Sequence, residues 1–267
     1  MKKSGIFTVI TGASKGLGKS LAIECARTGK NLILVSLPDE SVSLTAIELS
    51  KKYNIQAIGY ETDLTIEKNI YSLAEWINSN YQIDMLINNA GIGGTNNFGD
   101  AKVNYIDTII QLNMRALVLL THQLLPLLKS QQRSYVLNIA SMAAFGPMPY
   151  KTIYPASKAF VSSFSRGLNA ELKGTNVSVS VAHPGGMATN PEIIERLNKY
   201  NRLVKSTFIP PEKIAKICIK QTLASKPVIV PGLANKISRL FFSFVPEDLR
   251  LNIFSRNLKK EMLVQGA

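Results

Sequence analysis

Short apolar runs rich in β-branched residues alternate along this chain with longer segments in which apolar residues recur every three or four positions. The short runs predict strands and the longer segments predict amphipathic helices. The predicted strands are Phe7–Thr11, Leu32–Ser36, Gln56–Tyr60, Met85–Asn88, Tyr135–Ala140, Val177–Ala182 and Pro227–Val230. The predicted helices are Gly18–Thr28, Ser41–Tyr53, Ile66–Asn78, Ile106–Lys129, Tyr154–Lys173 and Pro211–Ala224. This alternation is typical of βαβ units, so we expect an α/β fold with a doubly wound parallel sheet of seven strands and helices on both faces.

The organisation of the chain indicates one catalytic domain, residues 1–232, followed by a helical extension, residues 233–267. No internal repeat, low-complexity linker or Pro/Gly-rich boundary divides the first part. In the extension, apolar groups such as Leu240-Phe241-Phe242 alternate with Lys and Arg, and Pro246-Glu247 interrupts the pattern. We expect two basic amphipathic helices. They would cover the domain's own core, extend a lid over the site, or lie on anionic lipid.

Composition restricts the class of protein. The chain has 267 residues, of which 46% are apolar, and this suits one large globular domain. No apolar run reaches 18 residues, so no membrane-spanning helix is predicted, and Ile6–Ile10 is too short for the core of a signal peptide. The two cysteines, Cys25 and Cys218, lie in predicted helices and are expected to be buried thiols in a reducing compartment. We therefore expect a cytoplasmic protein, with membrane association through the tail as an alternative.

The net charge of +13 is unevenly distributed. From Asn190 onward, 14 Lys or Arg residues stand against 6 Asp or Glu residues. Such a basic segment favours phosphate-bearing ligands or anionic membrane surfaces, although a solvated basic surface explains it equally well. DNA binding is disfavoured, because the sequence contains no recognisable reading helix.

A glycine-rich turn, Thr11–Gly18, joins the first predicted strand to the first predicted helix and reads TGASKGLG. Glycines let a backbone turn sharply and approach a pyrophosphate, while a helix amino terminus offers unpaired N–H groups to it. The turn stands where a dinucleotide site belongs, although its spacing is G-x-x-x-G-x-G rather than G-x-G-x-x-G.

Tyr154 and Lys158 lie four residues apart on one predicted helix, and therefore on one face of it. The pKa of a free phenol is about 10, and an adjacent ammonium is expected to lower it by stabilising the phenolate. Such a pair can give a proton to, or take one from, a group that interconverts between alcohol and carbonyl. The pair also arises by chance on many helices, so other motifs must support this interpretation.

Those motifs make the chain resemble the short-chain dehydrogenase/reductase family from about Ile6 to Pro231, and in particular its 3-oxoacyl and lipid-ketone reductases. The glycine turn matches the cofactor turn of the family, and Asn88–Gly91 matches its NNAG motif. The resemblance implies a Rossmann-type fold with a catalytic set of Asn113, Ser141, Tyr154 and Lys158. It also implies that a nicotinamide cofactor is held by Gly12, Ser14, Lys15, Gly16, Leu17, Gly18, Asp63, Leu64, Asn89, Ala90, Gly91, Tyr154, Lys158, Pro184, Gly185 and Thr189.

By resemblance, the segment after the second predicted strand decides between NAD(H) and NADP(H). The family usually places an acid there for NAD or an arginine for NADP, and this chain has Leu37. NADP(H) is favoured over NAD(H), because Lys15 stands where NADP-using relatives often carry a basic residue. Asp39, about two residues late, is the alternative partner for the ribose of NAD.

The resemblance implies interconversion of a ketone and a secondary alcohol, with Tyr154 transferring the proton and Ser141 holding the carbonyl oxygen. Lys158 would lower the pKa of Tyr154 and bind the nicotinamide ribose, and Asn113 would hold a water that connects Lys158 to solvent. The segments 143–150 and 192–210 are expected to border an apolar pocket for a lipid-like or acyl substrate. No metal site is expected. The alternatives are a cofactor-sensing protein without turnover and a peripheral membrane protein that acts through its tail.

The predicted helix that contains Asn113 is apolar nearly all round, so more than one of its sides should be buried. By resemblance this helix forms a dimer interface, and a homodimer or homotetramer is expected. His122 on the same helix and His183 beside Pro184 are expected to be structural residues.

Overall fold

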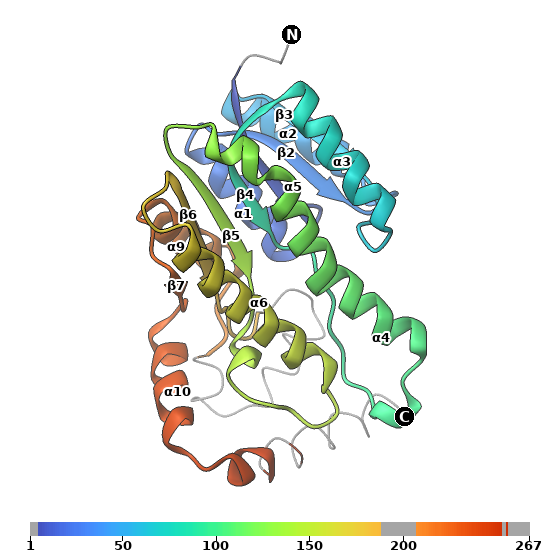
Figure 1. Ribbon diagram of the computed structural model, residues 1–267, viewed down its shortest axis with the longest axis vertical. Helices are drawn as coiled ribbons and strands as arrows, with labels where there is room; N and C mark the ends of the chain where they lie inside the picture. Colours follow the sequence, from blue (N-terminus) through green and yellow to red (C-terminus); the bar gives the residue numbers. More distant parts are fainter. Residues whose placement is uncertain (1–4, 188–206, 253–254, 256–267) are drawn as a thin grey trace.

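The computed structural model describes residues 5–187, 207–252 and 255, and shows one seven-stranded sheet in which every strand pair is parallel (Figure 1). Its order is β3-β2-β1-β4-β5-β6-β7, which confirms the predicted fold class. The strands are β1 (Ile6–Thr11), β2 (Asn31–Ser36), β3 (Ala57–Glu61), β4 (Gln82–Asn88), β5 (Ser134–Ile139), β6 (Val177–Ala182) and β7 (Val228–Ile229). The order reverses between β1 and β4, and in such sheets ligands bind beyond the carboxyl ends of the strands at this switch point.

The helices cover both faces of the sheet (Figure 1). One face carries α1 (Gly16–Arg27), α2 (Val42–Tyr53) and α9 (Pro211–Leu223), and the other carries α3 (Glu67–Asn80), α5 (Leu117–Lys129) and α6 (Ile153–Glu171). Successive strand residues point to opposite faces. Val9 therefore packs in the core under α3 and α5, whereas Ile10 packs in the core under α1, α2 and α9.

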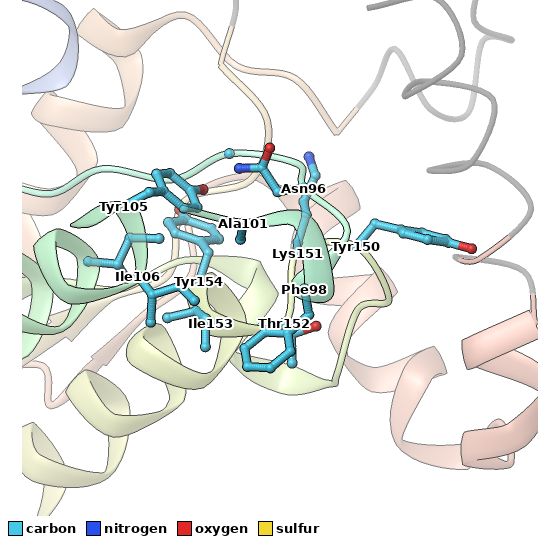
Figure 2. Close-up of a pocket in the computed structure, with 12 residues that line it drawn as sticks. Asn96, Phe98, Ala101, Tyr105, Ile106, Tyr150, Lys151, Thr152, Ile153 and Tyr154 are labelled. Carbon is cyan, nitrogen blue, oxygen red and sulfur yellow. The ribbon is translucent and has the colours of Figure 1, made fainter. Parts of the chain in front are cut away.

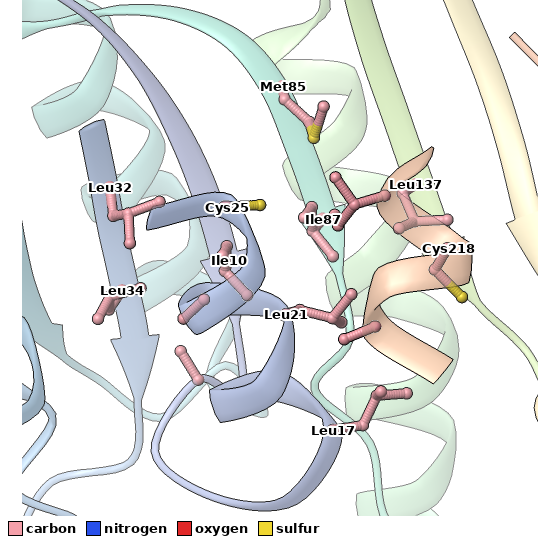
Figure 3. Packing of buried hydrophobic residues seen from close by; sticks show 14 of the residues in the cluster. Ile10, Leu17, Leu21, Cys25, Leu32, Leu34, Met85, Ile87, Leu137 and Cys218 are labelled. Atoms are coloured by element: carbon pink, nitrogen blue, oxygen red, sulfur yellow. The ribbon is translucent and has the colours of Figure 1, made fainter. Parts of the chain in front are cut away.

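The two predicted buried thiols are confirmed. Cys25 on α1 and Cys218 on α9 are free and fully buried in the core between these helices and the sheet (Figure 3). Burial raises the pKa of each thiol to about 12. Both cysteines therefore act as small apolar core residues.

The long helix predicted at Ile106–Lys129 differs from the prediction in two ways. It begins earlier, with α4 (Val103–Ile110), and it contains a π-helical stretch, η2 (Gln111–Ala116), before it continues as α5. A π-helical turn inserts one residue and shifts the phase of the apolar pattern, but this helix is apolar nearly all round, so periodicity could not reveal the shift. Such turns are frequent at functional sites, and this one contains Asn113.

The predicted interruption of the tail at Pro246 is confirmed. Helix α10 (Leu233–Phe244) ends before it, and residues 247–252 are helical again. Within the described ranges, no helix combines the length and the apolar character needed to cross a bilayer. The division of the chain at residue 232 stays a prediction.

Candidate active site

The glycine turn and the segment after β4 form one hydrogen-bonded unit at the switch point. The backbone N–H groups of Asn89 and Ala90 donate to Thr11 Oγ1 at 3.0 and 3.1 Å, and Asn89 Nδ2 donates to the carbonyls of Thr11 and Gly12 at 3.0 Å each. Gly12 has a φ of +65°, which favours glycine. A Cβ at Gly18 would lie 1.8 Å from the Gly12 carbonyl oxygen, so only glycine lets α1 begin this close to the turn.

A cleft of about 790 Å³ opens along this edge of the sheet. Most of the residues that the sequence predicted for cofactor and substrate line it, namely Gly12, Ser14, Lys15, Leu17, Gly18, Asp63, Leu64, Asn89, Ala90, Gly91, Ser141, Tyr154, Lys158, Pro184 and Gly185. Gly16 and Asn113 do not line the cleft, and Thr189 lies outside the described residues. Gly12 and Gly18, two of the three glycines of the turn, line the cleft without a side chain, and the space fits an extended dinucleotide.

The cleft has an acidic residue that the sequence analysis missed. Glu40, in the turn after β2, lines the cleft and accepts hydrogen bonds from Ser14 Oγ at 2.5 Å and Lys15 Nζ at 2.6 Å. These bonds, with the larger effect from Lys15, hold the pKa of Glu40 below its usual value. Asp39, the acid proposed from sequence, is not among the cleft residues. Glu40 follows it directly in sequence, but only the turn geometry distinguishes the two.

Three predicted catalytic residues lie together at the other end of the cleft. Ser141 stands two residues after the end of β5. Its Oγ accepts a hydrogen bond from Ala143 N at 3.1 Å, and its hydroxyl hydrogen-bonds the Tyr154 phenol. Lys158, one turn along α6 from Tyr154, is buried and donates to the Ile139 carbonyl at 3.0 Å. Its Nζ lies 5.8 Å from the centre of the Tyr154 ring. A hydroxyl, a phenol and an ammonium therefore converge on one wall of the cleft.

Gly93 provides the surface on which the Tyr154 ring rests. A Cβ built at Gly93 would lie 2.7 Å from Tyr154 Cδ2, so any side chain there would displace the ring. The sequence motif ends at Gly91 and does not reveal this contact.

Asn113 holds two segments of the site together through its side-chain amide. Its side chain accepts a hydrogen bond from Ile92 N at 2.9 Å, and donates to Ile92 O at 2.9 Å and to Ser157 Oγ at 3.0 Å. The amide thus joins the segment after β4 to α6 from within the π-helical turn. Through these bonds Asn113 braces the helix that carries Tyr154 and Lys158. The water-binding role of Asn113 stays a prediction.

Burial governs the acid–base properties of Tyr154 and Lys158. It raises the pKa of Tyr154, and the hydrogen bond from Ser141 opposes this only in part. Lys158 is not among the groups that shift the pKa of Tyr154 here, because its ammonium donates to a backbone carbonyl rather than to the phenol oxygen, and the expected lowering stays a prediction. Burial lowers the pKa of Lys158 itself to about 8. Tyr154 is therefore a protonated acid at neutral pH, and Lys158 is close to its titration point.

His183 is structural, as expected, and it supports the loop that begins at Ser141. It is fully buried, its Nδ1 lies 3.2 Å from the Ser141 carbonyl oxygen and its Nε2 lies 3.4 Å from Ser162 Oγ. The Phe145 ring packs on it with a centroid distance of 4.5 Å. Burial lowers the pKa of His183 to about 4, so the imidazole is neutral in the folded protein. His122 is exposed on α5.

We expect His183 to make the fold sensitive to acid. Its pKa is about 4 in the folded state and close to 6.5 in the unfolded state, so protonation favours unfolding. Stability should be complete above pH 6.5 and fall between pH 6.5 and 4, by at most about 3 kcal/mol. Urea unfolding across this range should show a shallower pH dependence for His183→Asn than for wild type. His122→Asn, at an exposed site, is the matched control and should leave the slope unchanged; equal slopes in all three proteins would contradict the assignment.

The substrate side of the cleft differs in part from the prediction. Residues 143–150 were expected to border the pocket. Tyr150 lines a small additional pocket beside Tyr154, whereas Phe145 packs between His183 and Arg239. This pocket lies behind Tyr154, and segment 94–109 forms its other wall (Figure 2). Figure 2 shows the Tyr105 and Tyr154 rings close together, whereas Tyr150 points away from them. Segment 94–109 had no motif to mark it, and most of the predicted lid, 192–206, lies outside the described residues.

The parallel sheet, the cleft at its switch point, and the half-buried Tyr154 beside the buried Lys158 define an oxidoreductase of the nucleotide-binding class. A profile of the short chain dehydrogenase family matches residues 7–198. The chain belongs to this family.

Comparison with individual proteins agrees with the assignment to the short chain dehydrogenase family. The chain is 33% identical to the very-long-chain 3-oxoacyl-CoA reductase of Anas platyrhynchos, over 72% of this chain but only 63% of that protein. It is 27% identical to 17-beta-hydroxysteroid dehydrogenase type 3 of Rattus norvegicus, over 98% of this chain and 86% of that protein. The chain thus spans about three fifths of the length of the very-long-chain 3-oxoacyl-CoA reductases it matches.

Solved structures show the same fold. A 7beta-hydroxysteroid dehydrogenase superposes with a TM-score of 0.83 at 20% identity, covering 94% of this chain and 97% of that one. The short-chain dehydrogenase from Sphingobium yanoikuyae in complex with NADPH superposes with a TM-score of 0.75 at 25% identity. The match covers 91% of this chain and 97% of that one.

Proposed function

We propose that this protein interconverts a ketone and a secondary alcohol on an apolar, lipid-like or acyl substrate, with a preference for NADP(H). The observation that carries the proposal is the convergence of Ser141, Tyr154 and Lys158 at the end of a cleft whose other end is the glycine turn. Relatives named for very-long-chain 3-oxoacyl-CoA and for hydroxysteroids support an apolar ketone as the substrate.

The chain's own residues perform the proton chemistry. A bound nicotinamide cofactor supplies the hydride in reduction and accepts it in oxidation. Tyr154, protonated because burial raises its pKa, donates its proton to the carbonyl oxygen and recovers it from solvent. Ser141 hydrogen-bonds the same oxygen and stabilises the negative charge that develops there. Lys158 places a positive charge beside the phenolate that remains after transfer. In oxidation, Tyr154 takes the proton from the alcohol.

The cofactor would extend from the glycine turn, with Asp63 and Leu64 beside its adenine, to Pro184 and Gly185. Lys15 is 81% exposed and its ammonium is free to reach a 2′-phosphate once it leaves Glu40. The complex of a relative with NADPH supports NADP(H) as the cofactor. Glu40 argues against NADP(H), because this carboxylate already neutralises Lys15 and would repel a 2′-phosphate.

Purified protein should bind NADPH more tightly than NADH in a fluorescence titration. Glu40→Gln should tighten NADPH binding further, by about threefold, because an exposed ion pair contributes less than about 1 kcal/mol. Lys15→Met should weaken binding of NADPH and leave that of NADH unchanged. Lys19→Met, one turn further along in α1 and not among the cleft residues, is the control. Tighter binding of NADH than of NADPH by the wild type would refute the NADP preference.

Turnover measurements test whether the substrate is an apolar ketone. Oxidation of NADPH should be followed with ketones of increasing chain length, and kcat/KM should rise with apolar length. A protein that binds NADPH and turns over none of these ketones would be the cofactor-sensing protein instead.

We further propose that helices α4 and α5 form a homodimer or homotetramer interface. The exposure of Val103 (78%) and Ile110 (42%) on α4 supports this interface. Light scattering that gives a monomer would exclude it.

We also propose a cytoplasmic location. The buried thiols of Cys25 and Cys218 support a reducing compartment.

A further inference from the structure

The π-helical stretch η2 contacts two parts of the site that lie far apart in the sequence. Asn113 joins the segment after β4 to α6. Two residues later, Arg115 reaches the segment between β3 and α3, where its Nη2 donates to the Thr65 carbonyl. Helices α3 and α5 lie side by side on one face of the sheet, and η2 stands at the start of α5 (Figure 1). One π-helical turn therefore supports both the helix that carries Tyr154 and a second segment of the cleft.

Arg115 binds this second segment through both of its terminal nitrogens. Besides the bond from Nη2 to Thr65, its Nη1 lies 3.7 Å from Glu67 Oε2, at the start of α3. Hydrogen bonds from a charged donor are roughly twice as strong as neutral ones, and the planar fork of an arginine fixes the positions of its acceptors. The Nε of Arg115 is buried without a hydrogen-bond partner among the described residues. Burying a donor in this way costs free energy, so the contacts of the two Nη atoms must hold the side chain in place.

Thr65 in turn holds Asp63. The backbone N–H and the Oγ1 of Thr65 both donate to Asp63 Oδ1, at 2.8 Å each. From the first turn of α3, Asn69 Nδ2 donates to the Asp63 carbonyl at 3.0 Å. Asp63, Leu64 and Thr65 all line the cleft. A chain of hydrogen bonds therefore runs from Arg115 to the carboxylate of Asp63, at the end of the cleft proposed for adenine.

We propose that Arg115 is a positioning residue for the adenine half of the cofactor. Arg115 does not line the cleft, so it acts through Thr65, which holds Asp63 and Leu64 in place before the cofactor arrives. Ordering a segment on binding costs free energy, and a segment that is already ordered avoids this cost. This role rests on the proposed cofactor site, and it concerns NADP(H) and NAD(H) equally because both contain adenine.

Nucleotide binding to the full chain tests this role. Fluorescence titration should show that Arg115→Met weakens binding of NADPH and of NADH by the same factor, about tenfold, because the adenine segment must then be ordered on binding. In competition with NADPH, adenosine diphosphate should lose the same factor. Reduced nicotinamide mononucleotide contains no adenine, so its dissociation constant should stay within about twofold of the wild-type value.

Lys68→Met is the matched control for the loss of charge. Lys68 is an exposed cation next to Glu67 and does not line the cleft, so this variant should bind every nucleotide like the wild type. Arg115→Lys keeps the charge and one donor but not the fork, and it should show the pattern of Arg115→Met with a smaller loss, about threefold. Thermal unfolding monitors the fold of every variant, and Arg115→Lys decides the test if Arg115→Met does not fold.

Three results would overturn the positioning role: unchanged binding in Arg115→Met, an equal loss for reduced nicotinamide mononucleotide, or a loss that Lys68→Met shares. The first would mean that Thr65 needs no support, the second that the whole cleft is weakened, and the third that charge alone matters. A wild type that binds neither NADPH nor NADH would instead refute the proposed function, and the role of Arg115 with it.

Discussion

Replacing Tyr154 with phenylalanine should lower kcat for ketone reduction by about a hundredfold or more, while the dissociation constant for NADPH stays within about twofold. Positioned proton transfer contributes this much to many enzymatic reactions. The substitution removes only the hydroxyl, and the ring can keep its place on Gly93. Single-turnover kinetics with saturating NADPH, together with a cofactor titration, would separate the loss of chemistry from a loss of binding.

Tyr135→Phe is the matched control for this experiment. Tyr135 is a buried tyrosine whose phenol points to the Leu223 carbonyl, at 3.4 Å, and it does not line the cleft. We expect a small loss of stability and an unchanged kcat. If Tyr154→Phe kept more than about a tenth of the wild-type activity, the barrier would have changed by less than ~1.4 kcal/mol, and Tyr154 could not be the proton donor.

The fold could be predicted from the sequence because local and global signals agree. Every predicted strand is present and lies in one parallel sheet, since a strand buried on both faces gives an almost continuous apolar run. The glycine turn was also predictable. The close approach of Gly18 to the Gly12 carbonyl excludes every other residue, and this restriction is visible directly in the sequence.

Other parts of the site depend on three-dimensional contacts without a sequence signal. Glu40 reaches Ser14 and Lys15 only because of the turn after β2, and nothing distinguishes it from Asp39 in the sequence. The exposure of Leu233, Ile237 and Phe244 on α10 could not be predicted either. The hydrophobic period shows that a helix has an apolar face but not whether that face meets the core.

The pKa of Tyr154 shows why spacing alone was insufficient. Four residues place Lys158 on the same face of α6, but the spacing does not decide which acceptor the ammonium binds. The carbonyl of Ile139, at the end of β5, takes that hydrogen bond. Burial then dominates the electrostatics of both groups, raising the pKa of Tyr154 and lowering that of Lys158.

Lys158→Met should abolish turnover and at the same time make the protein more stable at neutral pH. Burial lowers the pKa of Lys158 from 10.5 to about 8, so holding the ammonium in the folded state opposes folding by at most about 3 kcal/mol. Methionine has a similar shape without the charge. Loss of the hydrogen bond to Ile139 offsets about 1 kcal/mol of this gain. Differential scanning calorimetry should therefore show a Tm higher by about 2–5 °C.

The pH dependence of the stability shows whether the buried ammonium of Lys158 causes the difference in Tm. In the unfolded state Lys158 keeps its proton up to about pH 10.5, whereas in the folded state it loses the proton near pH 8. Wild-type stability should therefore gain a contribution as pH rises from 8 to 10.5, and this contribution should be missing in Lys158→Met. Lys30→Met is the opposite control, because Lys30 Nζ pairs with Asp84 at 2.6 Å and its loss leaves that carboxylate without its cation. Lys30→Met should lower the Tm; a lower Tm for Lys158→Met as well would show that the buried ammonium stabilises the fold, contrary to this account.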